Sequence, residues 1–251
     1  AVLQKPTFAQ QIFEREQQRT LAALREAQTK PEVLADREFR HLLYGGHPYS
    51  RRGSGQVETL VTLRRDDVVE FYRQHFTAGG AVVSIIGDLT RSEAAAIAEH
   101  LTAGLSRRSQ ALPALPPVAQ LKTAETSRIA HPASQAHIRI GQPGIKRLDP
   151  DYFALFLGNH VLGGGGFSSR LNDEIRQKRG YAYSAYSYFN PLSQEGPFQI
   201  ALQTKKEQAE EALKVARDTL ARFVAEGPTQ QELDAAKQNI IGGFPLRLDS
   251  N

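Results

Sequence analysis

The chain has 251 residues, a formal net charge of +4 and no cysteine. The lack of cysteine excludes disulfides and thiol catalysis, and the basic pairs have acidic neighbours, so a solvated mixed surface explains the charge better than nucleic-acid binding. No uninterrupted apolar run approaches the roughly 18 residues that a membrane-spanning helix needs. Residue 1 is not methionine and no signal peptide follows it, which predicts that the chain begins inside a longer gene product.

Helical composition without Gly or Pro opens the chain, and Ile97 and Leu101 lie four residues apart in a later Ala-rich segment. The elements predicted for this half are helices over 7–30, 31–43, 65–76 and 91–102, a loop over 45–55 and a buried strand over 81–86. The stretch Leu112-Pro113-Ala114-Leu115-Pro116-Pro117 follows. Prolines this dense prevent regular structure, so we expect a first domain over 1–108, a linker over 109–118 and a second domain over 119–251.

Strands and helices alternate less regularly beyond the linker. The predicted elements are strands over 121–129, 134–140, 181–189 and 198–203, and helices over 150–162, 207–225 and 230–241. Between them, the four glycines at 163–166 break the preceding helix. Ser168 or Ser169 can cap a new helix, and Leu171 and Ile175 give that helix an apolar stripe.

A helix-to-strand corner follows this run of glycines. Gly180 stops the helix, because glycine is the usual residue just past a helix end. The Tyr/Ala/Tyr/Ser alternation from residue 181 to residue 188 then has the period of a strand. Arg176 and Tyr183 therefore flank the corner.

This corner resembles the Arg-x6-Tyr segment in the C-terminal half of insulinase-type zinc metallopeptidases, the family of pitrilysin and the mitochondrial processing peptidase. Other segments resemble the family in the expected order, and together they cover nearly the whole chain. They are YGGHPYS at 44–50, DDVVEFY at 66–72, IGDLT at 86–90 and GPT-x-x-EL at 227–233.

The resemblance implies an α+β fold of two related domains of the mitochondrial-processing-peptidase type, each an antiparallel-rich sheet packed with helices. A weak internal repeat, which we call the internal echo, supports the two related domains: Pro6-Thr7-x-x-Gln10 is similar to Pro228-Thr229-x-x-Glu232 about 220 residues later. On this interpretation the first domain lacks its N-terminal part and the second is truncated at its end. The alternative is that both segments are common capping boxes.

Active family members hold zinc with a His-x-x-Glu-His helix and a distant glutamate. No two of the seven histidines are four residues apart, and His131 and His137, six apart, make a weak metal pair. The resemblance places the distant glutamate at Ala23, which cannot bind a metal. Glu26 is a possible substitute but fits a solvated helix position better, and His160 fits a packed or surface histidine better than a ligand. We therefore predict no metal ligands and no cofactor in this chain.

In active members, the residues matching Arg176 and Tyr183 face the metal across a chamber, hold the peptide and stabilise the oxyanion. The expected catalytic residues are thus Arg176 and Tyr183, assisting a partner's zinc site. The expected substrate-binding residues are Gly164, Gly165, Phe167 and Ser168. The glycine run lacks the spacing and lysine of a phosphate-binding P-loop, and structural flexibility is its alternative role. If the family resemblance is set aside, the favoured interpretation is that Arg176 pairs with Asp173 or Glu174 and that Tyr183 fills a strand face.

The sequence thus favours a catalytically inactive subunit, working in a hetero-oligomer with a zinc-bearing family member on a peptide substrate. One alternative is part of an active metalloendopeptidase whose zinc motif lies upstream, against which Ala23 argues. Another is a purely structural homologue, against which Arg176 and Tyr183 argue. For a bacterial protein we favour the periplasm over the cytoplasm. The peptide preferred and the identity of the partner are not encoded in these motifs.

Overall fold

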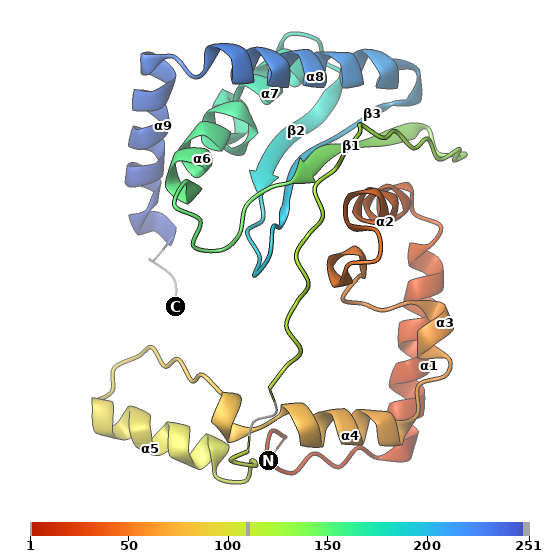
Figure 1. Ribbon diagram of the computed structural model, residues 1–251, viewed down its shortest axis with the longest axis vertical. Coiled ribbons are helices and arrows are strands. Elements are labelled where there is room, and N and C mark those ends of the chain that lie inside the picture. Colours follow the sequence, from red (N-terminus) through yellow and green to blue (C-terminus); the bar gives the residue numbers. More distant parts are fainter. Residues whose placement is uncertain (1, 109–110, 248–251) are drawn as a thin grey trace. The chain divides into compact units, whose positions relative to one another are not determined.

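A computed structural model describes residues 2–108 and 111–247. The chain divides into two compact units, Ala1–Ala27 with Gly53–Ala114 and Gln28–Arg52 with Leu115–Asn251, whose helices and strands are labelled in Figure 1. Segment 28–52, which the sequence places within a domain over 1–108, thus packs with residues beyond 114. Residues 109 and 110 of the expected linker and 248–251 of the expected second domain lie outside the described residues.

The first unit contains the helices α1 (Gln10–Ala27), α3 (Val57–Leu60), α4 (Arg65–His75) and α5 (Arg91–Thr102). The predicted helices over 7–30, 65–76 and 91–102 are confirmed. A capping box opens α5: the backbone N–H of Glu93 donates to Thr90 Oγ1 (3.3 Å), and the backbone N–H of Thr90 donates to Glu93 Oε2 (2.8 Å). The Gln17 amide ties α1 to the last residue of α3 and to the segment after it, through the backbone oxygens of residues 60 and 63.

The predicted buried strand over 81–86 is wrong. These residues have no regular structure, and Val82 and Ile86 are 91% and 95% exposed. Apolar, β-branched side chains suggested the strand, but a strand also needs a neighbour to pair its N–H and C=O groups. Within the described part of this unit, the nearest ladder contact is an isolated parallel bridge between Thr77 and Ser106, and no segment pairs with 81–86.

The second unit is built on a three-stranded antiparallel sheet. Its strands are β1 (Gln135–Pro143), β2 (Ala182–Phe189) and β3 (Pro197–Lys205), in the order β1-β3-β2. The predicted strands over 134–140, 181–189 and 198–203 are confirmed. The predicted strand over 121–129 is wrong, because this segment is exposed and, among the described residues, pairs with no strand.

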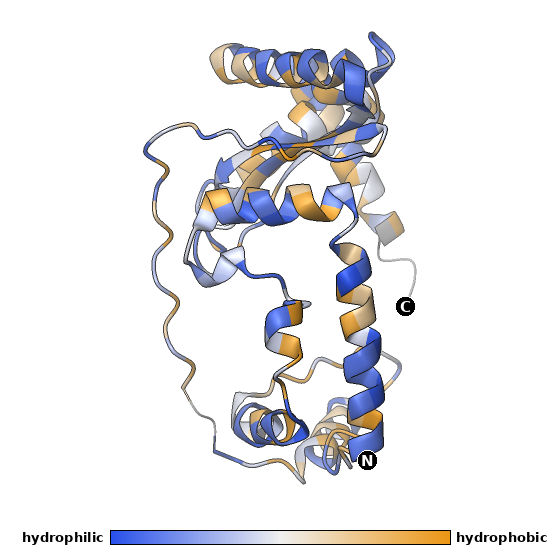
Figure 2. Ribbon diagram, turned by 90° about the vertical axis from the view of Figure 1, so that its right-hand side faces the viewer, coloured by the Kyte–Doolittle hydropathy of each residue, from blue (hydrophilic) through white to orange (hydrophobic). Residues whose placement is uncertain are grey.

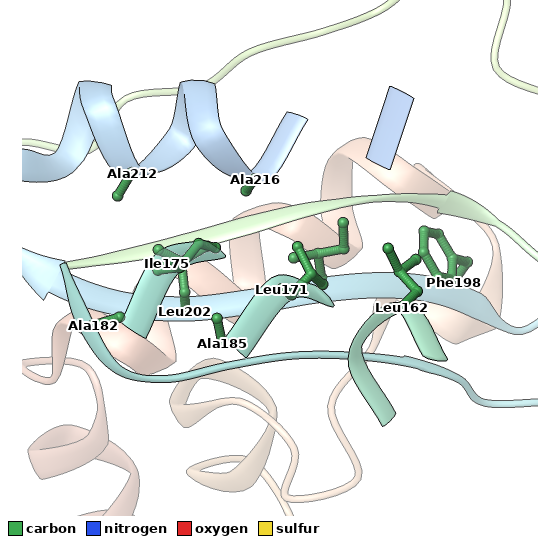
Figure 3. Packing of buried hydrophobic residues seen from close by; sticks show 10 residues of the cluster. Leu162, Leu171, Ile175, Ala182, Ala185, Phe198, Leu202, Ala212 and Ala216 are labelled. Carbon is green, nitrogen blue, oxygen red and sulfur yellow. The ribbon is translucent and has the colours of Figure 1, made fainter. Parts of the chain in front are cut away.

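Helices cover one face of this sheet and enclose the main core. They are α6 (Tyr152–Asn159), the π-helical η3 (His160–Gly164), α7 (Arg170–Asn172), the π-helical η5 (Asp173–Gln177) and α8 (Ala209–Glu226), with α9 (Gln230–Gly243) following. In α8, Ala212, Ala216 and Thr219 are buried at helical spacing, and Figure 2 shows hydrophobic and hydrophilic residues alternating along the helix. Figure 3 shows the two alanines above Ile175 of η5 and Leu202 of β3.

The opposite face of the sheet meets α2 (Pro31–Tyr44). Because side chains alternate along a strand, Ile138 and Ile140 of β1 point into the main core, whereas His137 and Gly141 face α2. His137 Nε2 lies 3.8 Å from the carboxylate of Glu32, and the ring of Phe39 lies against Gly141. Helices on both faces of an antiparallel sheet confirm the α+β class.

Candidate functional site

The glycine run begins inside a helix and does not simply end it. Gly163 and Gly164 belong to η3, which continues α6 in π-helical form. A Cβ on Gly163 would lie 2.5 Å from the backbone nitrogen of Ser187 in β2, so only glycine allows η3 to approach the strand this closely. Asn159 locks the same contact: its amide donates to the backbone oxygen of Ser187 (3.0 Å) and its Oδ1 accepts the Ser187 hydroxyl (2.7 Å).

The turn that follows carries Phe167 on a short 3-10 segment, Gly166–Ser168. Gly166 has a φ of +63°, in the left-handed region that glycine adopts at low cost. Ser169 occupies the N-cap position of α7, but its hydroxyl donates to the backbone oxygen of Gly166 (2.7 Å). The Ser168 hydroxyl donates to the backbone oxygen of Gly165 (3.0 Å). Both serines therefore brace the turn, and neither caps the next helix through its side chain as expected.

Arg176 lies in the π-helical segment η5, which follows α7 without a break. The segment ends as predicted at Gly180, whose φ is +64° and whose N–H donates to the backbone oxygen of Arg176 (2.9 Å). π-helical turns are rare and occur often at functional sites, because one extra residue in the turn redirects the side chains around it.

Tyr183 projects from a β-bulge at the start of β2. Ala182 pairs with Thr204 and Ala185 pairs with Leu202, so β2 has one residue more than β3 between these pairs. Bulges change the direction of a side chain, and Tyr183 is 83% exposed. Tyr183 therefore lies on a strand, as its alternative role has it, but its ring is exposed and does not pack in the core.

The guanidinium of Arg176 lies over two aromatic rings. Its Cζ is 4.5 Å from the ring centroid of Phe167 and 4.6 Å from that of Tyr183, within the range of cation–π attraction. The structure thus brings together three of the residues that the sequence singled out. The Gln177 side-chain amide adds a hydrogen bond to the backbone oxygen of Phe167 (2.7 Å).

The acidic neighbours of Arg176 pair with other cations. Glu174 contacts Lys178 (2.9 Å) and Arg179 (2.6 Å), and Asp173 contacts Lys178 (2.8 Å). These ion pairs lower the pKa of Glu174, chiefly through the hydrogen bond from Lys178. Within residues 2–108 and 111–247, no carboxylate pairs with Arg176, so the alternative that it pairs with Asp173 or Glu174 is wrong.

This arrangement presents hydrogen-bond donors that no carboxylate among the described residues occupies. A guanidinium carries five N–H donors in its plane, and a phenol adds an O–H donor. Among the described residues no hydrogen-bond acceptor pairs with the Arg176 guanidinium, whose recorded contacts are with the two rings, so its N–H donors are available to a ligand. Donors of this kind can bind a carbonyl or carboxylate oxygen, and they bind an oxygen more strongly as negative charge develops on it.

The other expected binding residues are divided between a cavity and the turn. Gly164 lines a cavity of about 380 Å³, whose walls are aromatic rings from α6 and β2. The lining residues are Tyr152, Phe156, Asn159, Gly163, Gly164, Gly166, Tyr186, Ser187, Tyr188 and Phe189. Gly165, Phe167 and Ser168 are not among them. Phe167 and Ser168 are exposed on the turn beside the cavity.

The described residues offer no donor set that fits a zinc site. In the described residues, no three His, Asp or Glu side chains lie close enough together to hold a metal ion. His131 Nε2 is 3.0 Å from the backbone oxygen of Thr29, and burial lowers the pKa of His137. Ala23 is exposed on α1. The structure therefore gives no reason to assign metal chemistry to these residues.

Sequence reasoning found Arg176, Tyr183 and Phe167 but missed Gln177 and the two irregular turns. Gln177 is ten residues from its partner Phe167, outside any helical or strand period. The bulge does leave a signal in the sequence, because the alternating tyrosines shift phase between Tyr183 and Tyr186, which are three residues apart.

Comparison with known proteins places the chain in a family. Residues 62–240 match the model of the peptidase M16 inactive domain. An uncharacterized zinc protease of Streptomyces coelicolor is 32% identical over 220 residues, which are 84% of this chain and 47% of that protein. The non-peptidase homolog YmxG of Helicobacter pylori is 29% identical over 99% of this chain and 57% of its own length. The chain thus spans about half the length of the curated relatives it matches.

A solved structure agrees with this assignment. The crystal structure of a peptidase M16 inactive domain from Pseudomonas fluorescens superposes with a TM-score of 0.92 at 40% identity, covering 96% of this chain and 58% of that one. In the described part of the chain, no helix is long and apolar enough to span a membrane. The family match covers well over half of the sequence, and the chain accordingly belongs to the peptidase M16 inactive-domain family.

Proposed function

We propose that this chain serves as the catalytically inactive half of an M16 peptidase, lending Arg176 and Tyr183 to a zinc-bearing partner that cleaves peptides. The observation that supports this most directly is the geometry of the two residues. Arg176 has no carboxylate partner among the described residues, and its Cζ lies 4.6 Å from the ring centroid of the exposed Tyr183. A surface arginine that served only stability would pair with the nearby Asp173 or Glu174, which pair with Lys178 and Arg179 instead.

The two side chains suit peptide hydrolysis for an electrostatic reason. When a nucleophile attacks a peptide carbonyl, negative charge develops on the carbonyl oxygen, and preorganised N–H and O–H donors stabilise it. Arg176 offers N–H donors and Tyr183 offers its phenol. In this proposal the partner supplies the zinc and its chemistry. This chain's residues hold the peptide and donate hydrogen bonds to its carbonyl oxygen.

We also propose that residues 164–168 contact the peptide, through Gly164, Gly165, Phe167 and Ser168. Gly164 and Gly166 line the aromatic-walled cavity, and exposed Phe167 follows directly. Glycine leaves the backbone open to close approach by a ligand. An apolar side chain of the peptide matches a cavity of this size and lining.

The two-domain organisation, with a linker over 109–118 between related domains over 1–108 and 119–251, is likewise a proposal. The internal echo supports it, because Pro6-Thr7 and Pro228-Thr229 each precede a helix, α1 and α9. A structure in which α1 and α9 occupy unrelated positions in their domains would contradict it.

Reconstitution tests the proposed function. The protein is purified alone and together with a zinc-bearing M16 subunit from the same organism, and cleavage of a peptide library is followed. We expect cleavage only by the mixture, with loss of turnover in Arg176→Ala. Cleavage by the protein alone would favour an active peptidase. A mixture in which Arg176→Ala leaves turnover unchanged would favour a structural role.

A further inference from the structure

We propose that Phe167, fixed in place by Gln177, is a positioning residue that aims the guanidinium of Arg176. The inference rests on the proposed function for its catalytic consequence, but the contact itself can be tested in the chain alone. Phe167 is 64% exposed, so its ring is not part of the buried core. The ring contacts the guanidinium of Arg176, whose Cζ lies 4.5 Å from the ring centroid.

The kind of contact matters as much as its distance. An ion pair would also hold Arg176, but a carboxylate would occupy the N–H donors and cancel the charge that a substrate oxygen needs. An aromatic face attracts the cation through its quadrupole and leaves the N–H donors at the edge of the guanidinium available. The rings of Phe167 and Tyr183 can therefore restrict the side chain of Arg176 without occupying its N–H donors or neutralising its charge.

Hydrogen bonds hold the backbone that carries the Phe167 ring. The Gln177 amide donates to the backbone oxygen of Phe167 (2.7 Å), and Gln177 directly follows Arg176. This bond therefore ties the turn that carries the ring to the π-helical segment that carries the guanidinium. One residue before Phe167, the backbone oxygen of Gly166 accepts a hydrogen bond from the Ser169 hydroxyl (2.7 Å). Neither end of the turn can shift without breaking one of these bonds.

The first test is structural and needs no partner. In the full chain labelled with 13C,15N-arginine, the Hδ protons of Arg176, identified through an Arg176→Lys sample, should be shifted upfield by the aromatic ring currents. Phe167→Leu should move them toward the values of exposed arginines, whereas Phe167→Tyr, which keeps a ring, should leave them in place. Gln177→Leu should produce a smaller change in the same direction. The matched control is Phe153→Leu, which removes an exposed ring of α6 (78% exposed) and should leave them unmoved.

The second test measures turnover in the reconstituted mixture. Phe167→Leu should lower kcat by about two- to fivefold, the range of an exposed cation–π contact, while Phe167→Tyr restores it to within twofold of the parent and Phe153→Leu changes nothing. Arg176 protons that do not respond to Phe167→Leu would overturn the proposal. The proposal would also be overturned if Phe167→Leu left kcat unchanged in a mixture whose turnover Arg176→Ala abolishes. If Arg176→Ala itself has no effect on turnover, the proposed function fails, and the resonance shifts alone decide whether Phe167 holds the guanidinium.

Discussion

The guanidinium carbon of Arg176 lies 4.6 Å from the ring centroid of Tyr183, and each residue reaches this contact from an irregular element. Arg176 lies in the π-helical η5, and Tyr183 lies in the β2 bulge. One residue removed from the strand would send every side chain beyond that point to the opposite face. In a π turn the extra residue likewise changes the direction of its neighbours. The meeting of the two side chains thus depends on both irregularities.

If these residues stabilise an oxyanion, Arg176→Ala and Tyr183→Phe should each lower kcat of the mixed complex about a hundredfold. KM should change much less, because the donors contribute most when negative charge develops. Steady-state kinetics on a peptide substrate, with the melting temperature measured alongside, separates lost catalysis from lost folding. The control is Arg217→Ala, which removes an exposed arginine of α8 and should leave both parameters unchanged. Full activity in both site variants would end the oxyanion hypothesis.

The purified chain should bind no zinc stoichiometrically and should hydrolyse no peptide. Zinc sites in proteins use three or four N, O or S ligands at about 2.0–2.3 Å, and the described residues contain no such group of His, Asp or Glu. Metal analysis after dialysis against a chelator and then against chelator-free buffer measures this directly. The result that contradicts it is one tightly held zinc per chain that is lost on mutation of the chain's own histidines.

The sequence predicted those elements whose pattern is local. α5, α8 and α9 each have an amphipathic or capped sequence, and capping boxes at Thr90 and Thr229 open α5 and α9 in the structure. The strands over 81–86 and 121–129 failed because apolar composition alone does not provide a pairing partner. Tertiary neighbours decide that, and the described residues offer none to either segment.

The site could be predicted only in part. The sequence predicts that Arg176 and Tyr183 flank a helix-to-strand corner, and the structure places the Arg176 guanidinium over the Tyr183 ring. The contact with Phe167 and the Gln177 bond depend on how the turn at 166–168 folds back on η5. That path is set by the left-handed φ of Gly166 and by hydrogen bonds between groups without regular spacing. Such contacts do not follow from periodicity.

Gly163→Ala should destabilise the chain by about 1–3 kcal/mol, the usual cost of overpacking a closed contact. The added methyl would lie 2.5 Å from the backbone nitrogen of Ser187 and 2.8 Å from Leu171 Cδ1, and Leu171 is fully buried. The matched control is Gly242→Ala in α9, where nothing lies within 4 Å. It should be neutral or stabilise the chain by about 0.4–1 kcal/mol. Urea unfolding of both variants checks the difference, and equal stabilities would show that η3 does not press on β2.

The ion pair between Arg170 and Glu232 should make the stability of the second unit sensitive to acid. Arg170 donates from Nε and Nη2 to the two carboxylate oxygens, both at 2.7 Å, which ties α7 to the start of α9. The Arg170 hydrogen bonds, helped by those from Thr229, lower the pKa of Glu232 to about 2. A carboxyl whose folded pKa lies below its unfolded value stabilises the fold above the unfolded pKa and loses that contribution as the pH falls. The loss should therefore run from about pH 4.5, the ordinary value, down to about pH 2.

Glu232→Gln tests this, because the amide keeps the shape of the side chain but cannot ionise. We expect the free energy of unfolding of the variant to be about 2 kcal/mol lower than that of the parent at pH 7, the range of a hydrogen bond to a charged group. This difference should disappear as the pH falls from 4.5 to 2. Asp234→Asn is the control. Asp234 lies on the same helix and accepts an amide hydrogen bond from Gln230 (2.9 Å), but it makes no ion pair with any described residue. The free energy of unfolding of Asp234→Asn should differ little from that of the parent at every pH. Urea unfolding at a series of pH values gives both differences, and a Glu232→Gln difference that stays constant down to pH 2 would show that the charge of Glu232 contributes nothing to the folded state.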